Sequence, residues 1–279
     1  MQSSWRKYAL ALATVGTFFV CPNLAAAAPL RILMVGSSHT WGIKKPLRRV
    51  FASYGILATV DVIAPMHGSL LRNRSAALQA IKNGPNPELP YEHYDWVVLQ
   101  ENGGLQDLVN WAASLAIRNA AVQRGGDAIY YMTFPTKRDF LTGAYTTVLD
   151  RLIDGPCAVP SCPAVGTPPG CCRGYATLAH ATQLNMRVAP VGQSVVDFDR
   201  NPTHGADEIY GPDGRHLNAK GKYLAALTIF AAIERALPDS LWEPLSLAGT
   251  GVDYKRVARE AVFGPPTGIS HTWNLTADN

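Results

Sequence analysis

Charged residues are scarce in this sequence, and acidic ones are absent before Asp61. Charged side chains make up 16% of the 279 residues, and the formal net charge is only +4 at pH 7. No basic run with interleaved aromatic residues occurs either. This balance argues against nucleic acid or an anionic surface as the partner of the chain.

Long apolar stretches are missing everywhere except at the N-terminus, so no later segment is expected to span a bilayer. At the N-terminus, Arg6 and Lys7 precede an apolar stretch over 8–20, and small residues follow at 25–28. This order of segments is typical of a secretory signal peptide, which we predict to occupy residues 1–27.

Two alternatives to a cleaved signal peptide stay open at this point. One is an uncleaved membrane anchor. The other is a lipoprotein attached through Cys21, although Val20 stands where a small residue is wanted. The signal-peptide interpretation predicts an exported protein, periplasmic or secreted, with no stable membrane insertion after cleavage.

Cysteines are few and, apart from Cys21, they all lie in one short segment as Cys157, Cys162, Cys171 and Cys172. In an exported protein an even, clustered set indicates disulfides, and four cysteines can pair in three ways. A structural zinc site held by four thiolates is the alternative. Because the adjacent pair Cys171 and Cys172 lacks the usual two-residue gap, we predict two disulfides that brace a local loop.

Apolar runs alternate with amphipathic stretches through most of the remaining chain, which is typical of a mostly parallel sheet flanked by helices. We expect strands at 30–35, 58–64, 96–100, 127–133 and 186–191. We expect helices at 45–54, 70–82, 105–124, 140–153, 175–185 and 219–237. The pattern therefore predicts an α/β three-layer sandwich with a central, mostly parallel five-stranded sheet.

The alternation of apolar runs with amphipathic stretches is interrupted once and stops before the C-terminus. The Gly- and Pro-rich segment 155–174, which holds the four cysteines, is expected to be an insertion. From Pro238 onward the sequence has no clear periodicity, and no internal repeat or second domain is visible. We predict one domain over 28–236, followed by a tail, 237–279, that packs on the domain or is partly mobile.

A serine follows the first expected strand directly. The run Gly36-Ser37-Ser38 places Ser38 just beyond the carboxyl end of a central strand, where open α/β sheets bind their ligands. A serine nucleophile needs a base and an acid that orients the base, and Asp213 and His216 lie three residues apart in a Gly- and Pro-rich loop. Taken singly, these residues also fit a loop serine, a capping aspartate and a surface histidine. Their combination predicts a triad.

A serine nucleophile also needs donors that stabilise an oxyanion. The second expected strand leads to Gly68 and the third leads to Asn102, on the same edge of the sheet as Ser38. The backbone N–H of Gly68 and the side-chain amide of Asn102 are therefore candidate donors. The alternatives are a turn glycine and an asparagine that accepts a backbone hydrogen bond in its Asn-Gly turn.

Together these residues resemble the four sequence blocks of the SGNH (GDSL-like) hydrolase superfamily. The blocks are V-G-S-S-H-T-W-G around Ser38, H-G-S-L-L around Gly68, L-Q-E-N-G-G around Asn102, and D-G-R-H-L-N-A-K-G with Asp213 and His216. The V-V-L-Q-E stretch and the P-D-G-x-H…G-x-Y-L-A-A ending are similar to a secreted bacterial branch. The resemblance implies the flavodoxin-like SGNH fold, a catalytic triad of Ser38, His216 and Asp213, and an oxyanion hole of Ser38, Gly68 and Asn102.

The sequence departs from the usual blocks at supporting positions. Ser37 stands where the superfamily commonly has aspartate. In the third block, Gln100 replaces a glycine and Gly103 replaces an aspartate. These departures bear on the substrate class more than on the fold.

Four more residues beside the blocks are candidates for a substrate pocket: His39, Trp41, His67 and Ser69. The two histidines fit either substrate contact or plain packing. Ser69 could contribute a hydroxyl, and Trp41 could offer a stacking surface. A metal site of His39, His67 and His216 has no ligand-spaced pair behind it, so we predict no metal and no cofactor.

The residues and the resemblance together predict a serine esterase that hydrolyses acyl esters, including acetyl esters, through a covalent acyl-enzyme. The substrate is expected to be a small-molecule or polysaccharide ester, and nucleic acid is not expected as a partner. An acyltransferase acting on polysaccharide would use the same triad. A catalytically silent glycan-binding module is the alternative from a different class.

Overall fold

The computed structural model describes residues 28–66, 68–86, 92–100, 108–138, 184–200, 204–247 and 253–264. The expected signal peptide, the four clustered cysteines, and the helices expected at 140–153 and over most of 175–185 lie outside these ranges. Within them, no helix is both long enough and apolar enough to cross a membrane.

The core of the fold is a five-stranded sheet in which every pair of neighbours is parallel. Its strands, in the order in which they lie in the sheet, are β2 (Ala58–Ile63), β1 (Leu30–Val35), β3 (Trp96–Gln100), β4 (Asp127–Tyr131) and β5 (Arg187–Ala189). The predicted fold class is confirmed. Since the chain moves from β1 outward to β2 and later returns to the other side of β1, the topological switch point lies between β1 and β3.

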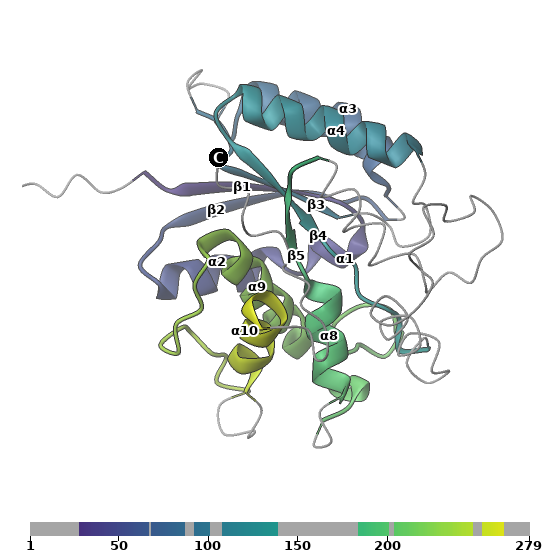
Figure 1. Ribbon diagram of the computed structural model, residues 1–279, viewed down its shortest axis with the longest axis vertical. Helices are drawn as coiled ribbons and strands as arrows, with labels where there is room; N and C mark the ends of the chain where they lie inside the picture. The colour runs from purple at the N-terminus through teal and green to yellow at the C-terminus, as the bar shows by residue number, and fades with distance from the viewer. Residues whose placement is uncertain are drawn as a thin grey trace, which may run out of the picture.

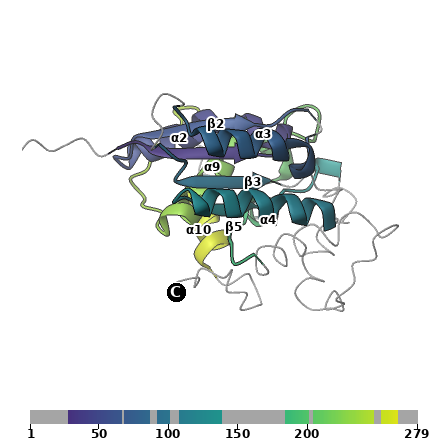
Figure 2. The same cartoon turned by 90° about the horizontal axis from the view of Figure 1, so that it is seen from above.

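Helices cover both faces of the sheet (Figures 1 and 2). One layer consists of α3 (Leu70–Asn83) and α4 (Leu108–Gln123), which pack against each other. The opposite layer consists of α2 (Lys44–Ser53), α8 (Val191–Arg200), α9 (Ala219–Glu234) and α10 (Tyr254–Phe263). The continuous apolar run of β1 serves both layers, because Leu33 and Val35 face one core while Ile32 and Met34 face the other.

Helix α9 lies at the centre of the second layer, in contact with α2, α8 and α10. A helix surrounded in this way must be apolar on all sides. Its sequence meets that demand, with an unbroken buried run from Tyr223 to Ile233. The helix ends at Glu234, three residues before the expected end at Leu237, because Arg235 takes the left-handed conformation with φ of 54°.

The expectation of an aperiodic tail from Pro238 onward is wrong for α10. Its buried residues are Tyr254, Val257, Ala258, Ala261 and Val262, which follow the spacing of one helix face. Asp253 caps the helix by accepting a hydrogen bond from the N–H of Arg256 at 2.8 Å. The apolar face packs on α9 and α8 and belongs to the same buried cluster.

The fifth strand is shorter than the expected 186–191, and a helix missed by the sequence analysis follows it. The apolar run continues from Val188 to Val191, but Pro190 cannot donate to a sheet ladder. The strand therefore stops at Ala189, and α8 starts at Val191. The four-residue helix α1 (Ser38–Trp41), which follows β1, was also not expected.

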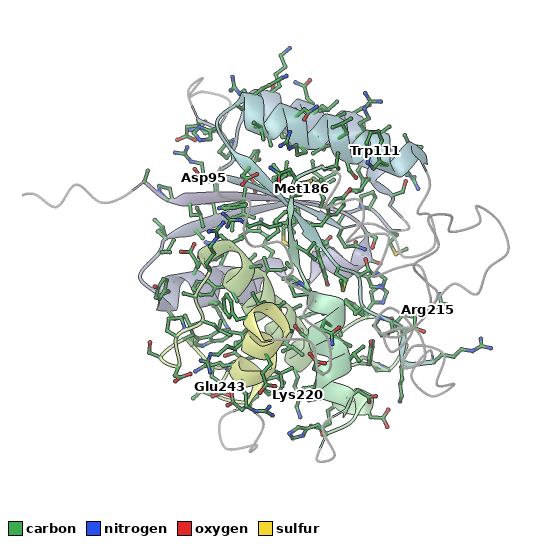
Figure 3. All side chains as sticks on the ribbon, viewed as in Figure 1. Asp95, Trp111, Met186, Arg215, Lys220 and Glu243 are labelled. Atoms are coloured by element: carbon green, nitrogen blue, oxygen red, sulfur yellow. The ribbon has the colours of Figure 1, made fainter. Side chains whose placement is uncertain are left out.

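The carboxyl edge of the sheet is the part that positions the candidate site. Figure 3 shows Asp95, just before β3, at the amino edge, and Arg215 beyond the opposite edge. The turn after β1, the turn after β2 and the loop before α9 come together at this carboxyl edge, since Ser38 bonds to His216 and Gly68 lies against Gly36.

Candidate active site

The nucleophile turn joins β1 to α1. Gly36 extends the pairing of β1 with β2, since its N–H donates to the carbonyl of Ile63 at 3.0 Å. Ser37 is the N-cap of α1, and its hydroxyl accepts from the N–H of His39 at 3.4 Å. Ser38 is the first helical residue and only half-buried, and it follows β1 directly at the switch point of the sheet.

The histidine loop, residues 210–218, leads into α9. Its ends meet in an antiparallel bridge between Tyr210 and Leu217, and the N–H of Gly211 donates to the carbonyl of His216 at 2.8 Å. Gly214 has φ of 62°, a left-handed conformation that glycine adopts at little cost. Its carbonyl accepts from the N–H of Lys137 at 2.7 Å, which fastens the loop to the segment after β4.

Two side chains fix the ends of this loop. The hydroxyl of Tyr210 donates to the carbonyl of Pro135 at 2.5 Å. Asn218 caps α9 by accepting from the N–H groups of Lys220 and Gly221, at 2.8 and 3.2 Å. Its own amide donates back to the carbonyl of Tyr210 at 3.1 Å. The loop is thus held at both ends by hydrogen bonds to backbone groups.

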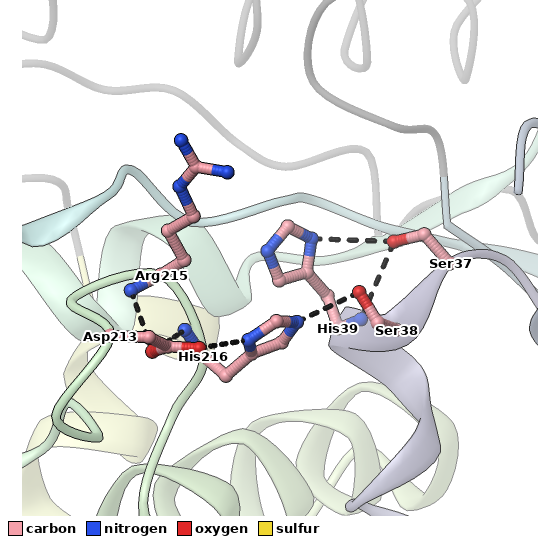
Figure 4. A network of polar contacts seen from close by, with 6 residues as sticks. All are labelled: Ser37, Ser38, His39, Asp213, Arg215 and His216. Carbon is pink, nitrogen blue, oxygen red and sulfur yellow. Dashed lines mark hydrogen bonds and ion pairs between the residues drawn. The ribbon is translucent and has the colours of Figure 1, made fainter. Parts of the chain in front are cut away.

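The two segments bring three side chains into one hydrogen-bonded chain (Figure 4). His216 Nε2 lies 2.8 Å from Ser38 Oγ, across 178 positions of sequence. His216 Nδ1 lies 2.5 Å from Asp213 Oδ2. The other carboxylate oxygen of Asp213 accepts from the backbone N–H groups of Arg215 and His216, each at 3.0 Å.

Electrostatics determine where the protons of this chain sit. The side-chain hydrogen bond from His216 holds the pKa of Asp213 well below its usual range, and the N–H groups of His216 and Arg215 lower it further. An ionised carboxylate can only accept, so the Nδ1 atom of His216 must carry a hydrogen. In the neutral ring Nε2 is then an acceptor, and Ser38 donates its hydroxyl proton to it.

Gly68 lies against the nucleophile turn. A Cβ at this position would lie 2.8 Å from the carbonyl oxygen of Gly36, so only glycine permits the approach. Its N–H, however, donates to the carbonyl of Pro65 at 2.9 Å. The N–H that the sequence suggests as an oxyanion donor is therefore already paired in this structure. The other suggested donor, Asn102, lies outside the described residues.

No family model matches this chain, and no curated protein matches it. Solved structures do match. One is a protein of Slackia heliotrinireducens assigned to the SGNH hydrolases, with 20% identity and a TM-score of 0.50, covering 74% of this chain and 100% of that one. Another is a DUF4886 family protein from Bacteroides uniformis, with 15% identity and a TM-score of 0.54, covering 84% of this chain and 93% of that one.

The chain has the fold of the SGNH hydrolases. Within this SGNH fold the five-stranded parallel sheet and its flanking helices agree with the architecture that the sequence resemblance implied. The likeness rests on the course of the backbone, because the identities are low.

The candidate pocket residues of the SGNH fold lie in different surroundings. Trp41 is 74% exposed, at the end of α1 and three residues past Ser38. Ser69 uses its hydroxyl to cap α3, accepting from the N–H of Arg72 at 3.2 Å. His67 lies outside the described residues. Among the candidates that the structure describes, Trp41 therefore has the most surface open to a ligand.

His39 is half-buried beside the triad. Its ring packs edge-on against Phe134, with centroids 4.9 Å apart, and lies 5.4 Å from the ring of His216. Its Nδ1 atom is 3.3 Å from the hydroxyl of Ser37. No group of three or more metal-ligating side chains occurs in the described part of the chain.

Sequence reasoning noted Gln100 only as a departure from the SGNH blocks, and it missed Asn73. Both are buried and both bond to the nucleophile turn: Gln100 Oε1 lies 2.8 Å from the nitrogen of Ser37, and Asn73 Nδ2 lies 2.6 Å from the carbonyl oxygen of Gly36. A polar residue at the end of a buried apolar strand is the one signal that pointed to Gln100. For Asn73, which lies in an amphipathic helix, the sequence offers no comparable signal.

Proposed function

We propose that this protein is a serine esterase that uses Ser38 as nucleophile, His216 as general base and Asp213 as the acid that orients the base. The observation that carries the proposal is the hydrogen-bonded chain from Asp213 through both ring nitrogens of His216 to Ser38 Oγ. This combination of nucleophile, base and orienting acid is the arrangement that activates a serine hydroxyl.

The first half of the reaction forms an acyl-enzyme. Ser38 Oγ attacks the ester carbonyl carbon while its proton passes to His216 Nε2, and the carbonyl oxygen becomes an oxyanion. The ionised carboxylate of Asp213 stabilises the resulting imidazolium. When the tetrahedral intermediate collapses, the bond to the leaving alkoxide breaks and His216 gives the proton to that oxygen.

The second half releases the acid. Water attacks the acyl carbon and gives its proton to His216, and the bond to Ser38 Oγ then breaks as the proton returns to it. No metal or organic cofactor takes part in either half. An acyltransferase differs only in this half, because an acceptor hydroxyl replaces the water.

The oxyanion is best placed to meet the N–H of Ser38. This group lies at the start of α1 and makes no hydrogen bond to any residue in the described ranges. The SGNH resemblance adds the amide of Asn102 and the N–H of Gly68. In this proposal Gly68 contributes only if its N–H leaves the carbonyl of Pro65 when substrate binds.

The substrate class in this proposal is an ester carried by a carbohydrate, and the protein acts outside the cytoplasm. The exposed indole of Trp41, which ends the short helix that begins with Ser38, is a surface on which a sugar ring can stack. The N-terminal pattern of a signal peptide supports export. A silent glycan-binding module would use the same indole but would keep its ligand after loss of Ser38.

The test is hydrolysis of p-nitrophenyl acetate and butyrate by the mature protein, alongside Ser38→Ala and His216→Ala. We expect both variants to lose kcat by about 10³-fold or more, with unchanged circular dichroism. Equal activity in all three proteins would remove Ser38 and His216 from the chemistry. Sugar binding that persists in a wild-type protein without turnover would favour the binding module.

A further inference from the structure

The peptide group between Gly36 and Ser37, one residue before the proposed nucleophile, is held on both sides by buried amides. Its carbonyl oxygen accepts from Asn73 Nδ2 at 2.6 Å. Its N–H donates to Gln100 Oε1 at 2.8 Å. Because a trans peptide is planar and its C=O and N–H point in opposite directions, two partners on opposite sides fix both its position and its rotation.

We propose that Gln100 and Asn73 form an amide clamp that positions the Ser38 hydroxyl for His216. The two residues come from different elements, the last position of β3 and the first turn of α3, so the clamp ties the nucleophile turn to both. This inference rests on the proposed serine mechanism. It assigns positioning roles, since neither residue touches a reacting atom.

The orientation of the Gln100 amide follows from its partners. Oε1 receives two donors, the N–H of Ser37 and the hydroxyl of Ser37, each at 2.8 Å. Nε2 donates to the hydroxyl oxygen of Thr133 at 2.8 Å. A backbone N–H can only donate, so the oxygen of the amide must face Ser37.

The hydrogen bonds of the clamp lie in a part of the protein from which water is excluded. Gln100 is fully buried, and Ser37 and Asn73 are each 2% exposed. In such surroundings an unpaired donor or acceptor costs the full desolvation free energy of that group. Breaking any one of these hydrogen bonds is therefore strongly unfavourable. The hydroxyl proton of Ser37 goes to Gln100, which leaves the lone pairs of that oxygen to cap α1 at His39.

Close packing makes the clamp sensitive to size as well as to polarity. A Cβ on Gly36 would lie 2.7 Å from Gln100 Oε1 and 2.8 Å from its Cβ. The Asn73 amide would lie 3.0 Å from a Cβ on Gly68, so it also braces the Gly68 turn against the nucleophile turn. A shift of either amide therefore moves Ser38 relative to His216, where an error of about 1 Å costs about 10²-fold in rate.

The chemistry of the clamp gives an asymmetric test. Gln100 must present an acceptor to Ser37, which a carboxylate also does, whereas Asn73 must present a donor to Gly36, which a carboxylate does not. We expect Gln100→Leu, Asn73→Leu and Asn73→Asp to lower kcat by about 10- to 100-fold with KM little changed. Gln100→Glu should restore kcat well above the value of Gln100→Leu.

A matched control separates positioning from loss of stability. Ser194 and Thr228 form a buried hydrogen bond of 2.7 Å between α8 and α9, and the other partners of their hydroxyls are the carbonyls of Pro190 and Leu224, outside the nucleophile turn and the histidine loop. Thr228→Val removes a buried polar pair as Gln100→Leu does, so it should lower the melting temperature comparably and leave kcat unchanged. If kcat instead follows melting temperature across all these variants, or stays at the wild-type value in Gln100→Leu, the clamp does not position the nucleophile.

A second readout does not depend on turnover. The ¹⁵N resonance of His216 Nε2 reports its hydrogen bond to Ser38, and Ser38→Ala gives the reference value without that bond. In Gln100→Leu we expect the resonance to move toward the Ser38→Ala value, whereas in Thr228→Val it should match the wild type. A wild-type resonance in Gln100→Leu overturns the clamp even if the esterase activity is not found. A clamp confirmed in this way stands whether or not the natural ester is known.

Discussion

The turn that carries Ser38 is buried, whereas the loop that carries His216 lies at the surface. Ser37 and Thr40, on either side of the nucleophile, are 2% and 0% exposed, and their polar atoms bond within the protein. The side chains of Asp213 and His216 keep 50% and 41% of their surface in solvent. The nucleophile turn is therefore held in place by the buried core, whereas the histidine loop is held by backbone hydrogen bonds at the surface.

The two halves of the site can therefore be disrupted in different ways. Moving Ser38 requires a change in buried amides or in close packing, which also affects stability. Moving His216 requires only a change in local backbone conformation or in one exposed carboxylate. Substitutions in the histidine loop should therefore separate activity from stability, whereas substitutions around the nucleophile should couple them.

Replacing the exposed carboxylate should impair activity without harming the fold. In Asp213→Asn the amide can still accept from the N–H groups of Arg215 and His216, but its NH₂ would face Nδ1 and favour the wrong tautomer of His216. We expect kcat to fall by about 10²- to 10³-fold, less than the roughly 10⁴-fold known for a buried triad aspartate, because water can replace part of the interaction. Steady-state kinetics with p-nitrophenyl butyrate measure this.

The control for that variant is Asp207→Asn, which removes another exposed carboxylate near the same loop. Asp207 pairs with Lys137 and has no contact with His216. Its loss should change kcat by no more than about twofold, as expected for an exposed ion pair. Equal kcat in the wild type and Asp213→Asn would show that the histidine does not need its acid.

The lowered pKa of Asp213 also fixes the sign of its pH dependence. A carboxylate with a depressed folded-state pKa contributes to stability above its unfolded-state value of about 3.9, and the contribution disappears as pH falls through the folded-state value. Asp213 thus stays ionised at every pH above about 4. Any pH dependence of kcat/KM above about pH 4 must therefore come from the titration of another group.

Gly36→Ala should lower both activity and stability. The added methyl would meet Gln100 Oε1 at 2.7 Å and Thr40 Cγ2 at 3.0 Å. Overpacking of this kind costs about 1 to 3 kcal/mol, and the turn must shift to relieve it. Urea unfolding and kcat, measured together, should both change. Gly205→Ala, where the methyl meets nothing within 4 Å, is the control for a glycine substitution. A fully active Gly36→Ala would contradict the tight turn.

Gly214→Ala should have the smallest effect. At φ of 62° an alanine costs about 1 kcal/mol, and its methyl would lie 3.3 Å from Lys137 Cβ. We expect a small loss of stability in urea unfolding and a fall in kcat of only a few-fold, because Tyr210 and Asn218 still hold the ends of the loop. A loss of kcat as large as that of Gly36→Ala would mean that the two halves are held in the same way.

Much of the fold could be predicted from the sequence. Buried parallel strands such as β1 and β3 are continuous apolar runs, and their carboxyl ends share one edge, so Ser38 was expected at that edge with Asp213 and His216. Helix α10 was missed because its ten residues lie in a segment rich in Pro, Gly and polar residues, where a short pattern is hard to see.

The supporting contacts of the site could not be predicted. The bonds of Ser37 to Gln100 and of Gly36 to Asn73 join residues 63 and 37 positions apart, so they depend on the register of strands and the placement of a helix. The turn bond from Gly68 to Pro65 is a detail of backbone conformation that several sequences would share. Residue type suggests what a side chain can do, whereas its partners depend on the tertiary structure.

The assignment of Ser38 as the nucleophile is tested most directly by covalent labelling of the wild-type protein with a fluorophosphonate, followed by mass spectrometry of its peptides. We expect one adduct, on the peptide that contains Ser38, with none in Ser38→Ala and much slower labelling in His216→Ala. Labelling that is as fast in Ser38→Ala as in the wild type, or an adduct on a different residue, would contradict it.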